Sequence, residues 1–139
     1  MKNEALQIAK EADVIVCAMG ETADMSGECA SRTNLEMPDV QQELLAELAK
    51  MGKPVVLLNF AGRPTVLSWE KEHIPAIMNV WFGGSEVGDA LCDVIFGDKV
   101  PSGKLTTSMP KTTGQEPLYY NHQNTGRPVP DDNQKFAKF

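Results

Sequence analysis

The stretch richest in groups that could do chemistry runs from Gly20 to Pro38. It holds one arginine, several hydroxyl and amide side chains, and four carboxylates: Glu21, Asp24, Glu28 and Glu36. It follows an apolar run and precedes a patterned helix, and connections of this length without secondary structure of their own are usually functional or disordered. On its residues alone, the stretch predicts an acidic functional site on a loop.

Other familiar signatures are missing. The segment from Gly83 to Val87 lacks the second glycine of the G-x-S-x-G elbow, and the chain has no G-x-G-x-x-G and no P-loop. A Ser-His-Asp triad would need His73 or His122, and neither is expected beside a suitable serine. The three cysteines are widely spaced and, with two histidines, do not give zinc-ligand spacing. We therefore expect no metal and no cofactor.

Length and composition indicate one domain with an ordinary core. The chain has 139 residues, of which 42% are hydrophobic and 23% charged. Its formal net charge of -6 argues against a nucleic-acid partner or an anionic membrane surface, which would need basic clusters. No apolar run approaches the length of a membrane span.

Hydrophobic patterning predicts alternating helices and strands that position the acidic loop. Helices are expected over residues 3–12, 38–50, 65–72 and 88–96, and strands over 14–19, 55–59, 76–81 and 104–108. The pattern indicates an α/β fold with a mostly parallel sheet and helices on both faces, a three-layer α/β/α sandwich. The first strand is apolar throughout, which fits a strand covered on both faces.

The carboxyl ends of parallel strands share one edge of the sheet, where sites of α/β proteins form. Three loops, at residues 20–37, 59–64 and 81–88, should meet there. We assign residues 1–111 to the sandwich domain. Residues 112–139, where Gly, Pro, Asn, Asp and Gln dominate, are assigned to a carboxyl-terminal loop and tail that leads to a missing segment.

Five segments carry a resemblance to a known family: Gly27–Arg32, Gly62–Pro64, Trp81–Ala90, Phe96–Leu105 and Tyr119–Pro128. In this order they resemble the carboxyl-terminal α/β sandwich domain of glycoside hydrolase family 3, particularly its bacterial β-glucosidase branch. The resemblance implies that the chain is a fragment. It lacks the amino-terminal part of that sandwich domain and the preceding (β/α)8 barrel, which in the family supplies an aspartate nucleophile.

The resemblance also implies a role for Glu28. Retaining glycosidases pair a nucleophilic carboxylate with an acid/base carboxyl group about 5–5.5 Å away. In much of family 3 the acid/base glutamate lies in a loop resembling Ser26-Gly27-Glu28, although one branch uses a barrel histidine. We expect Glu28 to serve the hydrolysis of terminal β-D-glucosyl residues from a β-linked glucoside or oligosaccharide. The isolated chain should be inactive, because its partner is the barrel of the same parent chain.

Three residues are expected to support the loop: Glu21, Asp24 and Arg32. Glu21 is also the rival acid/base carboxylate. A guanidinium close to a general acid would favour the charged form of that acid, which is the wrong direction for its task. Arg32 is therefore expected to bind Asp24, Glu36 or a backbone carbonyl rather than Glu28.

Three further residues are candidates for substrate binding: Trp81, His122 and Arg127. Trp81 could stack on a sugar ring, although an aromatic residue at a strand end is more often core or interface. His122, Asn124 and Arg127 could donate to sugar hydroxyls or brace a domain interface. The main alternative function is a non-catalytic carbohydrate- or protein-binding module; a nucleotide-binding domain would lack its phosphate loop.

Overall fold

The computed structural model describes residues 1–121 and 123. In this part of the chain a parallel sheet has the strand order β1-β2-β3, with β1 at Ile15–Gly20, β2 at Val55–Phe60 and β3 at Ala76–Asn79. Gly20 pairs with Phe60, and Asn59 pairs with Asn79. The strands therefore end level with one another, and their loops leave from one edge.

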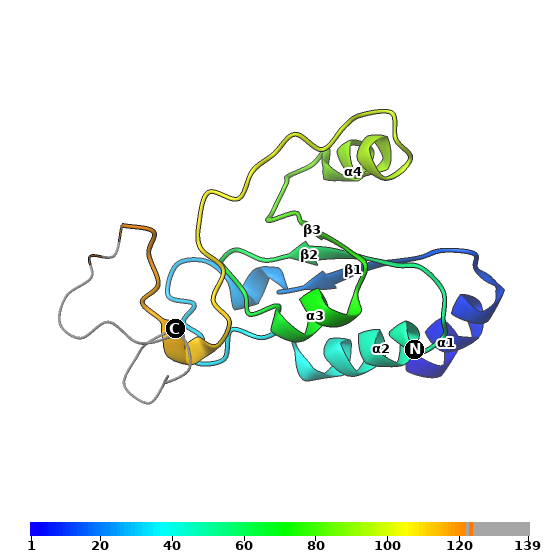
Figure 1. The fold of residues 1–139 in the computed structure, drawn as a ribbon, viewed down its shortest axis with the longest axis horizontal. Coiled ribbons are helices and arrows are strands. Elements are labelled where there is room, and N and C mark those ends of the chain that lie inside the picture. The colour runs from blue at the N-terminus through cyan, green and yellow to red at the C-terminus, as the bar shows by residue number, and fades with distance from the viewer. Residues whose placement is uncertain (122, 124–139) are drawn as a thin grey trace.

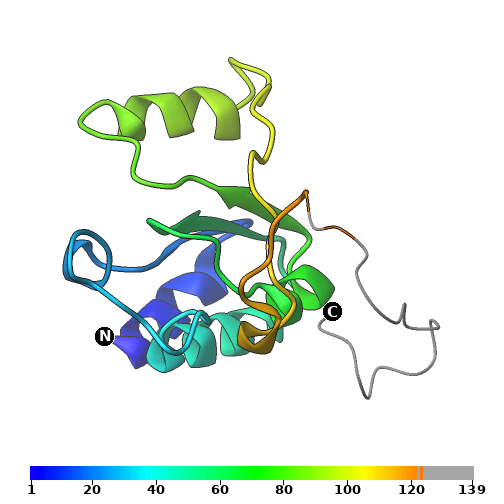
Figure 2. The same ribbon diagram turned by 90° about the vertical axis from the view of Figure 1, so that its left-hand side faces the viewer.

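Helices cover the two faces of the sheet unequally. α1 (Lys2–Glu11), α2 (Asp39–Ala49) and α3 (Ser68–His73) lie on one face, and α4 (Val87–Ile95) lies alone on the other (Figures 1 and 2). Short 3-10 turns occur at Ala23–Met25 and Thr113–Gln115. The predicted α/β fold with a parallel sheet and helices on both faces is confirmed. None of the described helices is long and apolar enough to cross a lipid bilayer.

The core lies between the sheet and α1–α3. Its buried side chains come from the strands, the helices and the segments that connect them: Ala9, Ile15, Cys17, Met37, Leu45, Leu48, Val55, Leu57 and Ile74. Burial also raises the pKa of the Cys17 thiol, which keeps it neutral. These apolar contacts hold the loop-bearing edge together.

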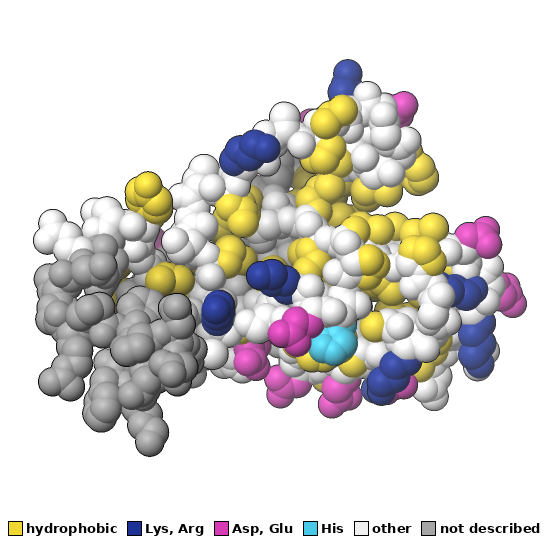
Figure 3. Space-filling model, viewed as in Figure 1, with side chains coloured by type: hydrophobic (Ala, Val, Ile, Leu, Met, Phe, Trp, Pro, Cys, Tyr) yellow, Lys and Arg dark blue, Asp and Glu magenta, His cyan; other side chains and the backbone are white. Residues whose placement is uncertain are grey.

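The other face of the sheet is largely uncovered, contrary to the expectation from the first strand. Along β1, Ile15 and Cys17 are buried, whereas Val16 between them is 46% exposed. On this side only α4 stands over the described strands, and none of its residues is buried. One short helix cannot cover a sheet face, so apolar side chains between α4 and the sheet lie at the surface (Figure 3).

Other expectations about individual elements were wrong. Residues 104–108 form no strand, because their backbone pairs with none of the described strands. Val40 is 74% exposed although its spacing matches the buried stripe of α2. Gln41 bonds Gly20 at the end of β1, so Val40 lies beyond the sheet that covers the rest of the helix. Ile8 lies at the helical spacing of the apolar residues in α1, and Cys92 lies in an apolar run, so both were expected to be buried, but both are exposed.

A buried carboxyl group in α3 was not anticipated. Glu70 is buried, and Gln42 Nε2 donates a hydrogen bond to its Oε1 at 3.5 Å. Burial raises the pKa of Glu70, and the charge of Glu36 adds to this rise. The folded chain therefore holds the Glu70 proton more tightly than the unfolded chain does.

The stability of the Glu70→Gln variant should depend on pH. Between the unfolded and folded pKa values, unfolding releases the Glu70 proton, so the free energy of unfolding of the wild type falls as pH rises. Glutamine carries no ionisable proton. The melting temperature of the variant, relative to wild type, should therefore rise as the pH increases above the ordinary glutamate pKa of about 4.3, in thermal unfolding followed by circular dichroism.

Glu47→Gln is the matched control with the opposite sign. A hydrogen bond from Lys50 lowers the pKa of the exposed Glu47, so its stabilising contribution is present at neutral pH and lost as pH falls. The melting temperature of this variant, relative to wild type, should fall as pH rises. Parallel pH trends in the two variants would show that burial of Glu70 does not control its ionisation.

Candidate functional site

The first residue after β1 is held in a fixed position. The backbone N–H of Glu21 donates to Phe60 O at 2.7 Å, which continues the β1–β2 ladder by one residue. A Cβ on Gly20 would lie 1.9 Å from the same oxygen, so this position requires glycine. The Gln41 side chain completes the strand end, because it accepts from Gly20 N at 2.7 Å and donates to Gly20 O at 3.0 Å.

The Glu21 carboxylate lies between two guanidinium groups. Arg32 Nη1 is 2.8 Å from Oε1, and Arg63 Nε is 3.0 Å from the same oxygen. The backbone N–H of Gly62 donates to Oε2 at 3.2 Å. The Glu21 side chain is only 1% exposed. A buried charge needs such partners, because water no longer solvates it.

The two arginines also hold the backbone of the acidic loop. Arg63 Nη2 donates to Met25 O at 2.7 Å and to Ala30 O at 3.1 Å. Arg32 Nη2 donates to Glu36 O at 3.3 Å, further along the loop. The guanidinium groups therefore connect the end of β1, the acidic loop and the turn after β2.

Asp24 makes only a local contact. Its Oδ1 accepts a hydrogen bond from Thr22 Oγ1 at 2.5 Å. That bond, together with the backbone N–H of Asp24, lowers the pKa of this exposed carboxyl group. The structure places Arg32 on Glu21 and on a carbonyl, and it does not pair Arg32 with Asp24.

Glu28 differs from its neighbours. Its side chain is exposed, and within residues 1–121 and 123 it has no hydrogen bond and no ion pair. It lies between Gly27, whose carbonyl accepts from Ala30 N at 3.1 Å, and Cys29, whose φ is 63°. The backbone around Glu28 thus forms a tight turn, while its carboxyl group faces solvent.

The loops after all three strands meet, as expected. Gly62, in the turn after β2, lies against Ser26 of the acidic loop, and the Phe82 ring, in the loop after β3, borders the same spot. Trp81, a substrate-binding candidate, is half-buried with a φ of 58°. A positive φ is unusual for a bulky residue and is typical of functional or strained positions.

The other two substrate-binding candidates, His122 and Arg127, lie outside the described residues, as does Asn124. Residues 111–115 bind back onto the domain. The Ser68 hydroxyl donates to Lys111 O at 2.7 Å, and Thr113 Oγ1 accepts from Leu35 N at 3.4 Å. The proposed boundary at residue 111 stays a prediction.

Sequence reasoning missed two groups of polar residues at this edge. Arg63 was assigned only to the loop at residues 59–64, although a charged residue three positions after a buried strand could have indicated a role at this edge. Asn59 Nδ2 donates to Thr65 Oγ1 at 3.1 Å and to Asn79 Oδ1 at 2.8 Å, linking β2 and β3 at their ends. Asn79 Nδ2 is buried and has no partner among the described residues.

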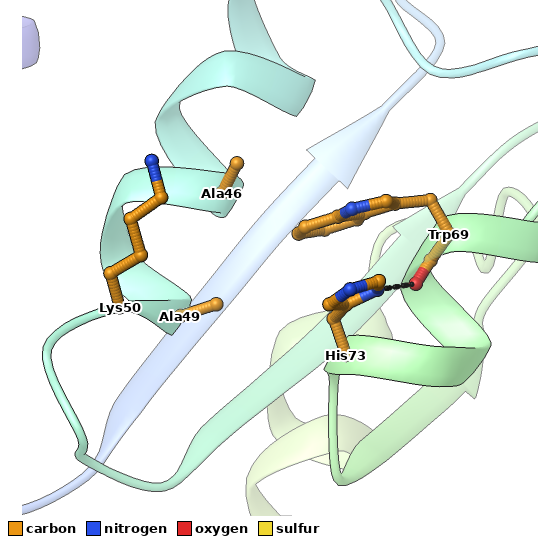
Figure 4. A pocket seen from close by; sticks show the side chains of 5 residues that line it. All are labelled: Ala46, Ala49, Lys50, Trp69 and His73. Atoms are coloured by element: carbon orange, nitrogen blue, oxygen red, sulfur yellow. Dashed lines mark hydrogen bonds between the residues drawn. The ribbon is translucent and has the colours of Figure 1, made fainter.

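A pocket of about 410 Å³ lies at the opposite end of the domain (Figure 4). Its walls come from the end of α2 and from α3, with Trp69 and His73 stacked at 4.4 Å between ring centroids. Since α2 and α3 run back to the starts of β2 and β3, this pocket is remote from the acidic loop. The described residues contain no group of three potential metal ligands.

The contact between Gly62 and Ser26 predicts a specific coupling. A Cβ at position 62 would lie 1.8 Å from Ser26 Oγ, so Gly62→Ala should lower the free energy of unfolding by about 1–3 kcal/mol. Adding Ser26→Gly removes the clashing atoms and should recover part of this loss in urea unfolding. Ser26→Gly alone is the control. Simple additivity of the two changes would contradict the contact.

Comparison with known proteins agrees with this geometry. The sequence model described as the glycosyl hydrolase family 3 C-terminal domain matches residues 1–138. The chain is 49% identical over 128 residues to a periplasmic β-glucosidase of Salmonella typhimurium, covering 92% of this chain and 17% of that protein. It is 42% identical over 117 residues to a β-xylosidase of Formosa agariphila, covering 84% of this chain and 16% of that protein.

Solved structures show the same relationship. The β-glucosidase of Listeria innocua in complex with glucose superposes with a TM-score of 0.87 at 37% identity, covering 98% of this chain and 19% of that one. The chain thus spans about a fifth or less of the relatives that it matches. Both the sequence match and the shared fold extend over nearly all of its length, and the chain belongs to glycoside hydrolase family 3 as a carboxyl-terminal domain.

Proposed function

We propose that this chain is the acid/base half of a retaining β-glucosidase-like hydrolase. Glu28 acts as the general acid and base, and the nucleophile is an aspartate on a (β/α)8 barrel of the same parent chain. The substrate is a terminal β-D-glucosyl residue in a glucoside or oligosaccharide. Relatives named as β-glucosidases, with both sequence and fold similar to this chain, support the substrate class.

The observation that carries the proposal is the different use of the loop carboxylates. Glu21 is enclosed by two arginines, and Asp24 accepts from Thr22. Glu36 lies where the loop pairs with Val66, close enough to Glu70 to raise its pKa. Among these carboxylates, only Glu28 is at once exposed, placed in the turn that Arg63 holds through Met25 O and Ala30 O, and without a cation among its described neighbours. A general acid must be able to reach the substrate and to hold a proton, and a paired cation would keep it ionised.

The proposed reaction has two proton transfers at Glu28. First, its protonated carboxyl group donates to the glycosidic oxygen while the barrel aspartate attacks the anomeric carbon and the C–O bond breaks. The resulting carboxylate then removes a proton from a water molecule, whose oxygen attacks the same carbon and releases the aspartate. Glu28 ends the cycle protonated, ready for the next substrate.

Trp81, His122 and Arg127 are proposed to contact the substrate. Trp81 lies on the loop that borders the Ser26–Gly62 contact, so it is close to the acidic loop. An aromatic ring there could stack on a sugar face. Glu21, Asp24 and Arg32 are proposed to support the loop without touching the substrate.

Replacing Glu28 in the parent enzyme tests the acid/base role. Glu28→Ala should lower kcat/KM for an alkyl β-glucoside by about 10²–10⁴-fold, since this leaving group needs a proton. The loss should be much smaller for 2,4-dinitrophenyl β-glucoside, whose leaving group departs as an anion. Azide should restore turnover of the activated substrate and give a β-glucosyl azide.

Glu36→Ala is the matched control, because it removes another exposed carboxylate of the same loop. It should leave the ratio of the two kcat/KM values unchanged. Full activity of Glu28→Ala on both substrates would reject the acid/base role. Sugar binding by the isolated chain in titration calorimetry would then favour the binding-module function.

The isolated chain should not hydrolyse an aryl β-glucoside, because the proposed nucleophile belongs to the barrel. Product release measured with the purified chain, against a buffer blank, checks this. Turnover that disappears in Glu28→Gln would show that the chain carries its own nucleophile. Turnover unaffected by that change would indicate a contaminating enzyme.

A further inference from the structure

Both ends of the turn that carries Glu28 are held by one nitrogen atom. Arg63 Nη2 donates to Met25 O at 2.7 Å and to Ala30 O at 3.1 Å, so residues 26–29 form a closed loop above it. The guanidinium group is planar and its donors keep a fixed geometry. The distance between the two carbonyl oxygens, and with it the width of the loop base, therefore follows from the position of Arg63.

Arg63 is itself fixed to the sheet. Its Nε lies 3.0 Å from Glu21 Oε1, and the Glu21 backbone extends the β1–β2 ladder through Phe60 O. Arg32 and the Gly62 N–H hold the same carboxylate from other directions. A continuous series of buried and partly buried polar contacts thus runs from the strand ends to the base of the loop.

The remaining contacts fix the shape of the loop and leave Glu28 free. Ser26 lies against the Gly62 backbone, and Ala30 N donates to Gly27 O at 3.1 Å. The Glu28 side chain makes none of these bonds, so only the backbone can determine where its carboxyl group lies. A change at the base of the loop would therefore shift the backbone that carries Glu28.

We propose that Arg63, anchored by Glu21, is a positioning residue for the general acid. This inference rests on the proposed role of Glu28. Proton donation to a leaving group requires hydrogen-bond distance in the reacting complex, and small displacements of a catalytic group are costly. Lysine at position 63 would keep the charge beside Glu21, but its single ammonium group cannot reproduce the fork that joins Glu21 to both carbonyls.

The test compares two substrates in the full-length enzyme. For Arg63→Lys, kcat/KM should fall at least about 10-fold more for an alkyl β-glucoside than for 2,4-dinitrophenyl β-glucoside, which needs little acid assistance. For each substrate, kcat/KM reports the glycosylation step, so the two values can be compared directly. A general loss of structure would reduce both values by the same factor.

Lys53→Met is the matched control. Lys53 also bridges two backbone carbonyls, those of Lys10 and Ala12, but it precedes β2 and lies at the opposite end of the sheet. Its loss should lower the melting temperature while both substrates keep the same ratio of kcat/KM. Glu21→Gln, which weakens the anchor of Arg63 and keeps the side-chain shape, should reproduce the selective loss even if Arg63→Lys does not fold.

The outcomes separate the two proposals. A selective loss in Glu28→Ala, together with equal losses on both substrates in every one of the Arg63→Lys and Glu21→Gln variants that folds, overturns the positioning role alone. Equal losses on both substrates in Glu28→Ala overturn the acid/base role on which it depends. Selective losses in Glu28→Ala and in the position-63 or position-21 variant support both.

Discussion

A carboxylate withdrawn from water determines how this domain arranges its candidate site. Glu21 is almost completely buried, and removing a charge from solvent costs several kcal/mol unless opposite charges and hydrogen bonds replace the lost water. Two arginines and a backbone N–H provide these partners. Because the partners come from the loop after β1 and the turn after β2, neither segment can move away without leaving the charge unpaired.

The same arrangement fixes the backbone of the loop and leaves the proposed catalytic carboxyl group unpaired. Every described contact near Glu28 involves the backbone of the loop or side chains on either side of it, whereas the Glu28 carboxyl group stays free. A group that must gain and lose a proton in each cycle benefits from this freedom, provided that its backbone is fixed. The charges that are withdrawn from solvent belong to Glu21 and Arg63, and neither residue has to gain or lose a proton in the proposed reaction.

The domain is also asymmetric across its sheet. The face toward α1–α3 has a continuous core, whereas the face toward α4 leaves Val16 and other apolar groups exposed. Exposed apolar surface of this kind is typical of a face that packs on further structure. The relatives that this chain matches are about five times longer or more. For the proposed reaction, the sheet edge at the carboxyl ends of the strands, which carries Glu28, would have to face the rest of such a protein.

Local pattern was sufficient to predict the element order, the parallel sheet and the edge where the loops meet. Runs such as Val55–Asn59 and the stripe of Leu44, Leu45 and Leu48 depend on neighbours along the chain, and the resemblance to a known family rested on short segments of the same kind. Pattern failed for Val40 and for residues 104–108, because burial and strand pairing depend on where another element ends.

The partners of the acidic loop emerged only in three dimensions. The sequence does not show which of the four carboxylates in the loop is paired with a cation. That pairing depends on Arg63, which lies 42 positions after Glu21. Helix and strand patterns repeat over a few residues, so they are visible in the sequence. The pairing of a buried charge depends on the register of β1 against β2, and only the folded chain brings Glu21 and Arg63 together.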